Sequence, residues 1–335
     1  MSEKPTQALV SVLIPVYRVE KYVARCLYSV LNQTYRPLEL VIVDDRGGDR
    51  SMEIVRELLP ESSSELQIRL LQNETNRGVA YCRQKLLEEA SGDYCLYLDS
   101  DDYWHSPDSL ECLVQAMLST GVDCLVTDYY ADYPKKKEYM RVNCPISSTD
   151  AAKAVLSGQM PGFMWNKCFR TEALRHHGGG FAPGKRLMED LRAIIPFFAS
   201  NIRIAYLPMA LVHYEQGNVS SLLSTTGAKD LNELMEAVDY CRDELLRRDP
   251  QAQERYGREI QMAYLNAKAL LYARSPLSFY PHIRACHPEV DHLNKIRPAA
   301  WYHKLIYKLQ SQALTGSLGY VLLLLLNRWK SFLRR

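Results

Sequence analysis

Two hydrophobic periods alternate along the first 130 residues, and this alternation constrains the fold more than any other feature of the sequence. Apolar, β-branched runs of strand length occur at Leu9–Pro15, Leu38–Val43, Ile68–Leu71, Tyr94–Leu98 and Cys124–Thr127. Between them, apolar residues recur at helical spacing in residues 23–31, 79–90 and 110–117. Nearly continuous apolar strands joined by helices are typical of a parallel sheet covered on both faces. The sequence therefore predicts an α/β, nucleotide-binding type of architecture.

The composition is that of a globular protein. The chain has 335 residues, 47% of them hydrophobic and 24% charged, which excludes collagen-like, low-complexity and fully disordered chains. The nine cysteines are an odd number and include no Cys-x-x-Cys pair, so we expect neither a disulfide framework nor a structural zinc site. The polar N-terminus has no apolar signal-peptide segment. These features favour a cytoplasmic protein.

The charge is distributed unevenly along the chain. The formal net charge is only +2, so we expect no binding to nucleic acid. Residues 292–335 hold eight Lys or Arg and no acid, which leaves 33 basic against 39 acidic residues elsewhere. Within residues 299–335 the apolar run Leu318–Leu326 is flanked by aromatic and basic residues. It is far shorter than the roughly 20 residues that span a bilayer. The pattern predicts an amphipathic tail on an anionic membrane surface; a helix packed on the body is the alternative.

Acidic residues follow three of the strand-like runs. They are Asp44, Asp45, Asp99, Asp101, Asp102 and Asp128. The carboxyl ends of parallel strands meet at one edge, where open α/β sheets bind ligands. Alternate carboxylates such as Asp99 and Asp101 can converge on Mg²⁺ or Mn²⁺, which prefer oxygen ligands. A turn leading into the next helix is the alternative interpretation of this acidic cluster.

An ordered set of short motifs resembles the glycosyltransferases of family 2. The motifs are Val-Leu-Ile-Pro-Val-Tyr at 12–17, Ser-Val-Leu-Asn-Gln-Thr at 29–34, Val-Ile-Val-Asp-Asp at 41–45, Asn-Arg-Gly at 76–78, Tyr-Leu-Asp-Ser-Asp-Asp at 97–102 and Glu-Asp at 189–190. The resemblance covers residues 9–220 and implies the GT-A fold, a Rossmann-like mixed sheet flanked by helices. It divides a catalytic domain, 1–222, into a nucleotide-binding part (9–130) and an acceptor part (131–222). A helical extension (223–298) and the basic tail (299–335) complete the expected organisation.

The resemblance also implies residue roles on the donor side. Nucleotide binding falls to Pro15, Val16, Tyr17, Asp44, Asp45, Arg83, Asp99 and Ser100. Tyr17 offers an aromatic face to a base, and an arginine such as Arg83 suits phosphate oxygens. Asp99 and Asp101 are the expected ligands of Mn²⁺ or Mg²⁺, with His213 as a further candidate. Arg46 stands where many relatives have glycine, which puts the geometry of that turn in question.

On the acceptor side, the resemblance implies that Asp190 is the catalytic base. In inverting members, the aspartate of a Glu-Asp pair removes the proton of the acceptor hydroxyl. An acidic first turn that merely complements a helix dipole is the alternative. Glu189, Trp165 and Lys167 are expected beside the acceptor. Residues 181–185 lead into the Glu-Asp pair and, with their glycine, are expected to form a mobile lid.

The predicted function is that of an inverting, metal-dependent glycosyltransferase. It would move one sugar from a nucleotide donor, expected to be UDP-linked, to a hydroxyl of a glycan or lipid-linked oligosaccharide in surface polysaccharide synthesis. It would act at the cytoplasmic face of the membrane. Three alternatives remain at this point: a nucleotidyltransferase that makes nucleotide-sugars, a phosphohydrolase with an aspartate nucleophile, and a membrane-associated glycan-binding protein without catalysis.

Overall fold

The computed structural model describes residues 7–178, 180–181, 184–218, 228–275 and 279–295. These residues form two compact units. The first comprises the described residues up to 152 together with those from 160 to 218, and the second comprises 153–159 and those from 228 on. The predicted boundary at 222 and the tail at 299–335 lie outside the described residues. Within the described ranges, no helix is both long and apolar enough to cross a bilayer.

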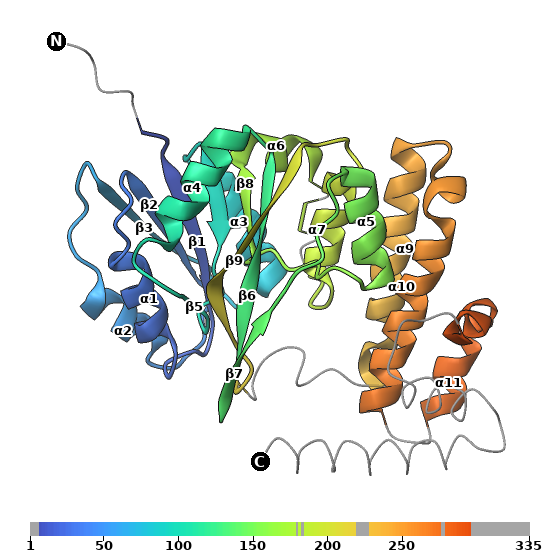
Figure 1. Ribbon diagram of the computed structural model, residues 1–335. Helices are drawn as coiled ribbons and strands as arrows, with labels where there is room; N and C mark the ends of the chain where they lie inside the picture. The colour runs from blue at the N-terminus through green and yellow to red at the C-terminus, as the bar shows by residue number, and fades with distance from the viewer. Residues whose placement is uncertain (1–6, 179, 182–183, 219–227, 276–278, 296–335) are drawn as a thin grey trace. The chain divides into compact units, whose positions relative to one another are not determined.

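The first unit is built on one mixed sheet (Figure 1). Its strands are β1 (Val10–Val16), β2 (Leu38–Asp44), β3 (Leu66–Gln72), β4 (Tyr94–Tyr97), β5 (Tyr103–Trp104), β6 (Cys124–Tyr133), β7 (Lys136–Met140), β8 (Lys167–Arg170) and β9 (Ile204–Glu215). They follow the order β3-β2-β1-β4-β8-β6-β9-β5, with β7 paired to β6. The five predicted strands are confirmed, with β6 longer than expected. The sheet is not wholly parallel, because β8 runs antiparallel to both β4 and β6.

Helices cover both faces of this sheet (Figure 1). They are α1 (Val23–Leu31), α2 (Ser51–Leu58), α3 (Val79–Glu89), α4 (Ser109–Thr120), α6 (Thr171–His177) and α7 (Glu189–Phe198), while α5 (Ser148–Ser157) spans the boundary between the two units. Alternate residues of β1, beginning with Val10 and Val12, form a core with the apolar stripes of α1, α2 and α4. Helix α3 is not part of this core. It contacts β1 and β2, and its residue Arg83 is buried.

The second unit is helical. It contains η1 (Ala228–Asp230), α9 (Leu231–Arg248), α10 (Ala252–Arg274), α11 (Tyr280–Ala285) and η3 (Pro288–Lys295). Helices α9 and α10 contact each other, and the stripe that includes Leu234, Val238 and Cys241 is buried, as its spacing predicts. The buried Lys268 of α10 forms an ion pair with Asp291, with 2.6 Å between Nζ and Oδ1.

Candidate active site

Most of the predicted acidic residues meet at one edge of the sheet. Strands β1, β2 and β4 are mutually parallel, and β6 and β9 share their direction because β8 is antiparallel to both β4 and β6. Their carboxyl ends therefore lie on the same side. Arg25 of α1 ties two of these ends together. Its guanidinium donates to the backbone oxygen of Asp101 (3.0 Å) and to the carboxylate of Glu215 at the end of β9 (2.9 Å).

A cavity of about 270 Å³ lies at the ends of β1, β2 and β3. Three predicted donor residues, Val16, Tyr17 and Asp44, line it. Tyr17 is 41% exposed, and Pro15 lies two residues before it in β1. The other lining residues are Arg18, Arg46, Gly47, Gly48, Asp49, Ser51, Met52, Arg56 and Gln72. The cavity thus combines a partly exposed aromatic residue with a carboxylate, which suits a planar base with an N–H group, and the Arg18 guanidinium lies 5.2 Å from the centroid of the Tyr17 ring.

The turn after β2 keeps a glycine-like geometry although it contains an arginine. Arg46 adopts φ of 60°, in the left-handed region that favours glycine. Its Nε donates to the backbone oxygen of Asn73 (2.8 Å), and its backbone N–H donates to Asp44 (2.8 Å). These bonds hold Arg46 at the cavity in spite of the unfavourable backbone conformation.

Asp45 is buried and saturated with hydrogen bonds. Its carboxylate accepts from the side chains of Asn73 (2.8 Å) and Asn76 (3.0 Å), and from the backbone N–H groups of Arg77 (2.7 Å) and Gly78 (2.9 Å). Gly78 has φ of 82° and directly precedes α3. In this structure Asp45 therefore fastens the entry of α3 to the end of β2.

Arg83 of α3 gathers three carboxylates around one buried guanidinium. The residue is 3% exposed and donates to Asp99 (2.7 Å), to Glu189 (2.6 Å) and to Asp190. Burial and the charge of Asp190 together raise the pKa of Glu189 to about 7, against the lowering effect of Arg83. Burial also raises the pKa of Asp190. One cation facing three acids leaves this cluster with excess negative charge.

The turn after β4 adds further carboxyl groups. Burial, reinforced by the neighbouring Asp99, raises the pKa of Asp101 to about 6, and burial raises the pKa of Asp102 well above its usual range. Asp101 accepts a hydrogen bond from Asn218 (2.8 Å), and Asp102 accepts one from the backbone N–H of Glu215 (2.8 Å). The other oxygen of Asp102 is buried without a hydrogen-bond partner. The turn also contains the buried Ser100.

This turn fits a divalent cation in its chemistry. Hard cations prefer carboxylate oxygens, and a nearby positive charge relieves the repulsion that raises these pKa values. Among the described residues, no group of three or more His, Cys, Asp or Glu side chains is arranged to hold a metal ion. Mg²⁺ is commonly bound through one or two carboxylates plus substrate phosphates. Asp99 and Asp101 fit that mode.

Two predicted polar residues have partners of their own. Nδ1 of His213 lies 2.8 Å from Asp132, and Nε2 lies 2.9 Å from His105. Both ring nitrogens of His213 are therefore engaged in this structure, and its role as a metal ligand stays a prediction. Asp128 lies inside β6 rather than at its end, and it accepts hydrogen bonds from Val142, Tyr139 and Tyr206.

The expected acceptor-side residues Trp165 and Lys167 are buried. The Trp165 ring packs against Phe163 at 4.8 Å and against Tyr129 at 4.9 Å between centroids. Lys167 begins β8, and burial lowers its pKa to about 8. Neither side chain is exposed enough to present a surface to an acceptor, whereas Glu189 stands at the start of α7 beside Arg83.

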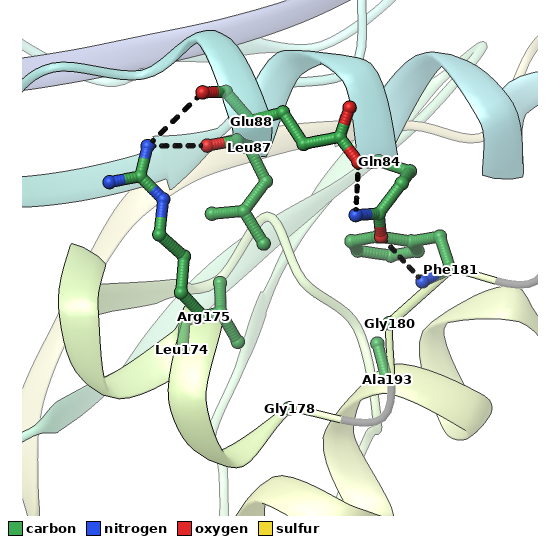
Figure 2. A pocket seen from close by; sticks show the side chains of 9 residues that line it. All are labelled: Gln84, Leu87, Glu88, Leu174, Arg175, Gly178, Gly180, Phe181 and Ala193. Atoms are coloured by element: carbon green, nitrogen blue, oxygen red, sulfur yellow. Dashed lines mark hydrogen bonds between the residues drawn. The ribbon is translucent and has the colours of Figure 1, made fainter.

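A second cavity, of about 280 Å³, lies beside the segment that leads to Glu189 and Asp190. Figure 2 shows Gln84 between Glu88 and Phe181, with Arg175 reaching the last turn of α3. The backbone N–H of Phe181 donates to Gln84 (3.0 Å), and its ring packs edge-on against Tyr97. Phe181 is therefore anchored in the core. Residues 182–183 of the predicted lid lie outside the described residues.

Sequence reasoning missed the residues that connect the strand ends. Arg25 and Glu215 join the ends of β4 and β9, and Asn73 and Asn76 hold Asp45. Asn73 comes two residues after the apolar run Ile68–Leu71, and Asn76 stands in the Asn-Arg-Gly motif at 76–78, so both positions carried a sequence signal. Arg25 carries no such signal, because its role depends on the return of β9 to the edge.

The sequence comparisons agree with this architecture. The model of the family "Glycosyl transferase family 2" matches residues 11–182. EpsH of Bacillus subtilis (strain 168) is 30% identical over 216 residues, which are 61% of this chain and 60% of EpsH. The Escherichia coli protein named UDP-Glc:alpha-D-GlcNAc-diphosphoundecaprenol beta-1,3-glucosyltransferase WfgD is 36% identical over 36% of this chain and 46% of WfgD. The matches thus span less than two thirds of either relative.

Solved structures show the same fold. Residues 1–349 of Staphylococcus aureus TarS in complex with UDP superpose with a TM-score of 0.63 at 21% identity, covering 88% of this chain and 87% of that one. The mannosyltransferase PcManGT from Pyrobaculum calidifontis, with GDP-Man and Mn²⁺, gives a TM-score of 0.52 at 15% identity, covering 97% and 88%. The family model matches more than half of the residues of this chain. The chain therefore belongs to glycosyl transferase family 2 and has the GT-A fold that its motifs predict.

Proposed function

We propose that this chain is an inverting, metal-dependent glycosyltransferase. It moves one sugar from a UDP-linked donor to a hydroxyl of a glycan or lipid-linked oligosaccharide in cell-surface polysaccharide synthesis. The observation that carries the proposal is the buried cluster of Arg83 with Asp99, Glu189 and Asp190. It lies at the sheet edge where the cavity of Tyr17 and Asp44 also opens.

In this proposal Asp190 is the general base. Its carboxylate takes the proton of the acceptor hydroxyl while that oxygen attacks the anomeric carbon of the donor sugar. The bond from the anomeric carbon to the diphosphate breaks, and the nucleoside diphosphate leaves with the bonding electrons. Attack from the face opposite the leaving group inverts the anomeric configuration. Arg83 keeps the carboxylate of Asp190 fixed for this transfer.

Asp99 and Asp101 would hold the cation. When bound, a divalent cation would offset the negative charge that develops on the departing diphosphate. The raised pKa of Asp101, to about 6, supports this role, since a carboxylate crowded by others gains most from a nearby positive charge. His213 is left out of the proposed ligand set because Asp132 and His105 engage it.

The relatives support the proposed substrates. TarS has been solved with UDP and with UDP-GlcNAc, and the name of WfgD specifies a UDP-Glc donor and a diphosphoundecaprenol-linked acceptor. PcManGT was solved with GDP-Man and Mn²⁺, so GDP-linked donors are the competing class. The basic tail, residues 299–335, supports a peripheral position at the cytoplasmic face, where it would meet anionic lipid.

The test is ligand-dependent thermal stability of the full chain. UDP, GDP, CDP and dTDP are each added with and without Mn²⁺ to the wild type, to Asp101→Asn and to the control Asp108→Asn, which changes an exposed aspartate. A ligand at 100 times its Kd adds about 2.7 kcal/mol, or a shift of several degrees. We expect a UDP shift that needs Mn²⁺, persists in Asp108→Asn and disappears in Asp101→Asn.

Each other outcome has a defined meaning. A shift with GDP in place of UDP would keep the reaction and change the donor. No shift with any nucleotide would overturn the proposal and favour a non-catalytic glycan-binding protein. Sugar transfer is then measured as UDP release from a panel of UDP-sugars in the presence of lipid-linked acceptors.

A further inference from the structure

Lys167 is a buried cation without a carboxylate among its hydrogen-bond partners. Its side chain is 1% exposed, and Nζ donates to the backbone oxygens of Pro161 (3.2 Å) and Phe163 and to Oδ1 of Asn166 (2.8 Å). Lysine is almost never fully buried unless it is paired, because taking an ammonium out of water is costly. These acceptors all belong to the segment immediately before Lys167. The ammonium therefore gathers residues 161–166 around itself.

The same segment is hydrogen-bonded to strand β6 through Asn166. The backbone N–H of Thr127 in β6 donates to the oxygen of Asn166 (3.0 Å), and Nδ2 of Asn166 donates to the oxygen of Thr127 (3.1 Å). The rings of Phe163 and Trp165 also pack against Tyr129 of β6 and Tyr214 of β9, and Lys167 adds the hydrogen bonds that draw the backbone of this stretch together. Residues 161–166 therefore form a short loop with a cation at its centre and β6 as its support.

The loop touches the proposed catalytic base. The backbone N–H of Met164 lies 3.4 Å from Oδ2 of Asp190, while Arg83 engages Oδ1 of the same carboxylate. Asp190 is thus held from α3 on one side and from the loop on the other. We propose that Lys167 is a positioning residue for Asp190, which shapes the 161–166 loop so that the Met164 N–H orients the carboxylate. This inference rests on the proposed role of Asp190.

Lys167 also contributes charge. The charged groups that face Asp190 are Arg83 from α3, Asp99 after β4, its neighbour Glu189 and Lys167 from β8. Burial and the charge of Asp99 raise the pKa of Asp190, whereas Arg83 and Lys167 lower it. Burial lowers the pKa of Lys167 to about 8, so the ammonium is mostly charged at neutral pH. Loss of this charge would raise the pKa of Asp190.

The test compares Lys167→Met, which removes charge and donors, with Lys167→Gln, which keeps an N–H donor. Lys268→Met is the matched control, because it removes a buried lysine of the helical unit. Donor affinity, kcat, KM and amide hydrogen exchange over residues 161–166 are measured on each folded full-length chain. In Lys167→Met we expect faster exchange in the loop and kcat lowered roughly 10- to 100-fold, with donor affinity within about 2-fold of the wild type.

Lys167→Gln should retain more loop protection than Lys167→Met, and in both variants the acidic limb of the kcat profile should move to higher pH. Lys268→Met should change neither loop exchange nor kcat. Unchanged kcat and unchanged loop exchange in Lys167→Met would overturn the inference, as would an unmoved acidic limb. A wild-type chain that transfers no sugar would instead overturn the proposed function, and the exchange measurement distinguishes the two failures.

Discussion

The ends of β2 and β4 carry neighbouring aspartates at the same edge, but their surroundings are opposite. Asp45 is met by four hydrogen-bond donors from one turn. Burial and the charge of Asp99 raise the pKa of Asp101, burial and the charge of Asp101 raise the pKa of Asp102, and Asp102 keeps an oxygen without a partner. A saturated carboxylate holds the fold together. A carboxylate that is crowded by other acids can instead bind a cation or accept a proton from a substrate.

The crowded region should be where a substitution costs most activity. Asp190→Asn removes the proposed base while keeping the shape of the side chain, and general-base catalysis contributes about 10²- to 10⁴-fold. We expect kcat, measured as nucleotide release at saturating donor, to fall by that factor. The affinity for UDP should change little. Full activity in Asp190→Asn would contradict the distinction between the two regions, because the crowded acids would then have a structural role, as Asp45 has.

The same comparison predicts opposite effects on stability. Asp45→Asn removes the negative charge to which four donors are hydrogen-bonded. A hydrogen bond to a charged group contributes about 1.5–3 kcal/mol to the free energy of unfolding. We expect the free energy of unfolding to fall by about 2–3 kcal/mol, measured by urea denaturation with a chelator present. Asp101→Asn relieves repulsion and should leave the metal-free chain equally or more stable. A loss of stability in Asp101→Asn as large as in Asp45→Asn would contradict the distinction.

A smaller effect should appear in the pH dependence of stability. The pKa of Asp101 rises from 3.8 to about 6 on folding and that of Glu189 from 4.5 to about 7. Because both values are higher in the folded state, their contribution is complete below about pH 4 and is lost as the pH rises to about 7. We expect the metal-free wild type to lose roughly 1–3 kcal/mol over this range relative to Asp101→Asn and Glu189→Gln.

Urea denaturation at a series of pH values measures this slope. Added Mn²⁺ should flatten it if the cation binds the ionised acids, since it then favours the charged form. Identical slopes in the wild type and both variants would show that these acids do not titrate differently in the folded chain.

The sequence predicted the parallel half of the fold better than the rest. Strands such as β1 and β2 are buried on both faces, so their apolar runs are visible without knowledge of their neighbours. The position of β8 between β4 and β6 is set by pairing over long distances in the chain, and no local pattern records it. The aspartates after β2 and β4 lie at one edge because strand direction alone brings them together, whereas Asp128 lies inside β6 because that strand continues to Tyr133.

Their individual surroundings could not be predicted in the same way. Whether an aspartate is saturated, like Asp45, or crowded, like Asp101, depends on which backbone N–H groups and side chains arrive from other turns. The pairing of His213 with Asp132 depends on the register of β9 against β6. The burial of Lys167 was equally hidden, since a lysine next to a strand is most often solvated.

The strand order also determines when the site can form during synthesis. Strands β1, β2 and β3 can pair as soon as the first 72 residues have emerged, since domains fold from the N-terminus during translation. The acidic turn between β4 and β5 must wait, because β5 pairs with β9, where Tyr103 lies opposite His213. A nascent chain that ends before β9 therefore carries every proposed metal-binding and catalytic aspartate without the strand that closes the turn. Ribosome-bound intermediates of this chain should bind no donor until strand β9 is made.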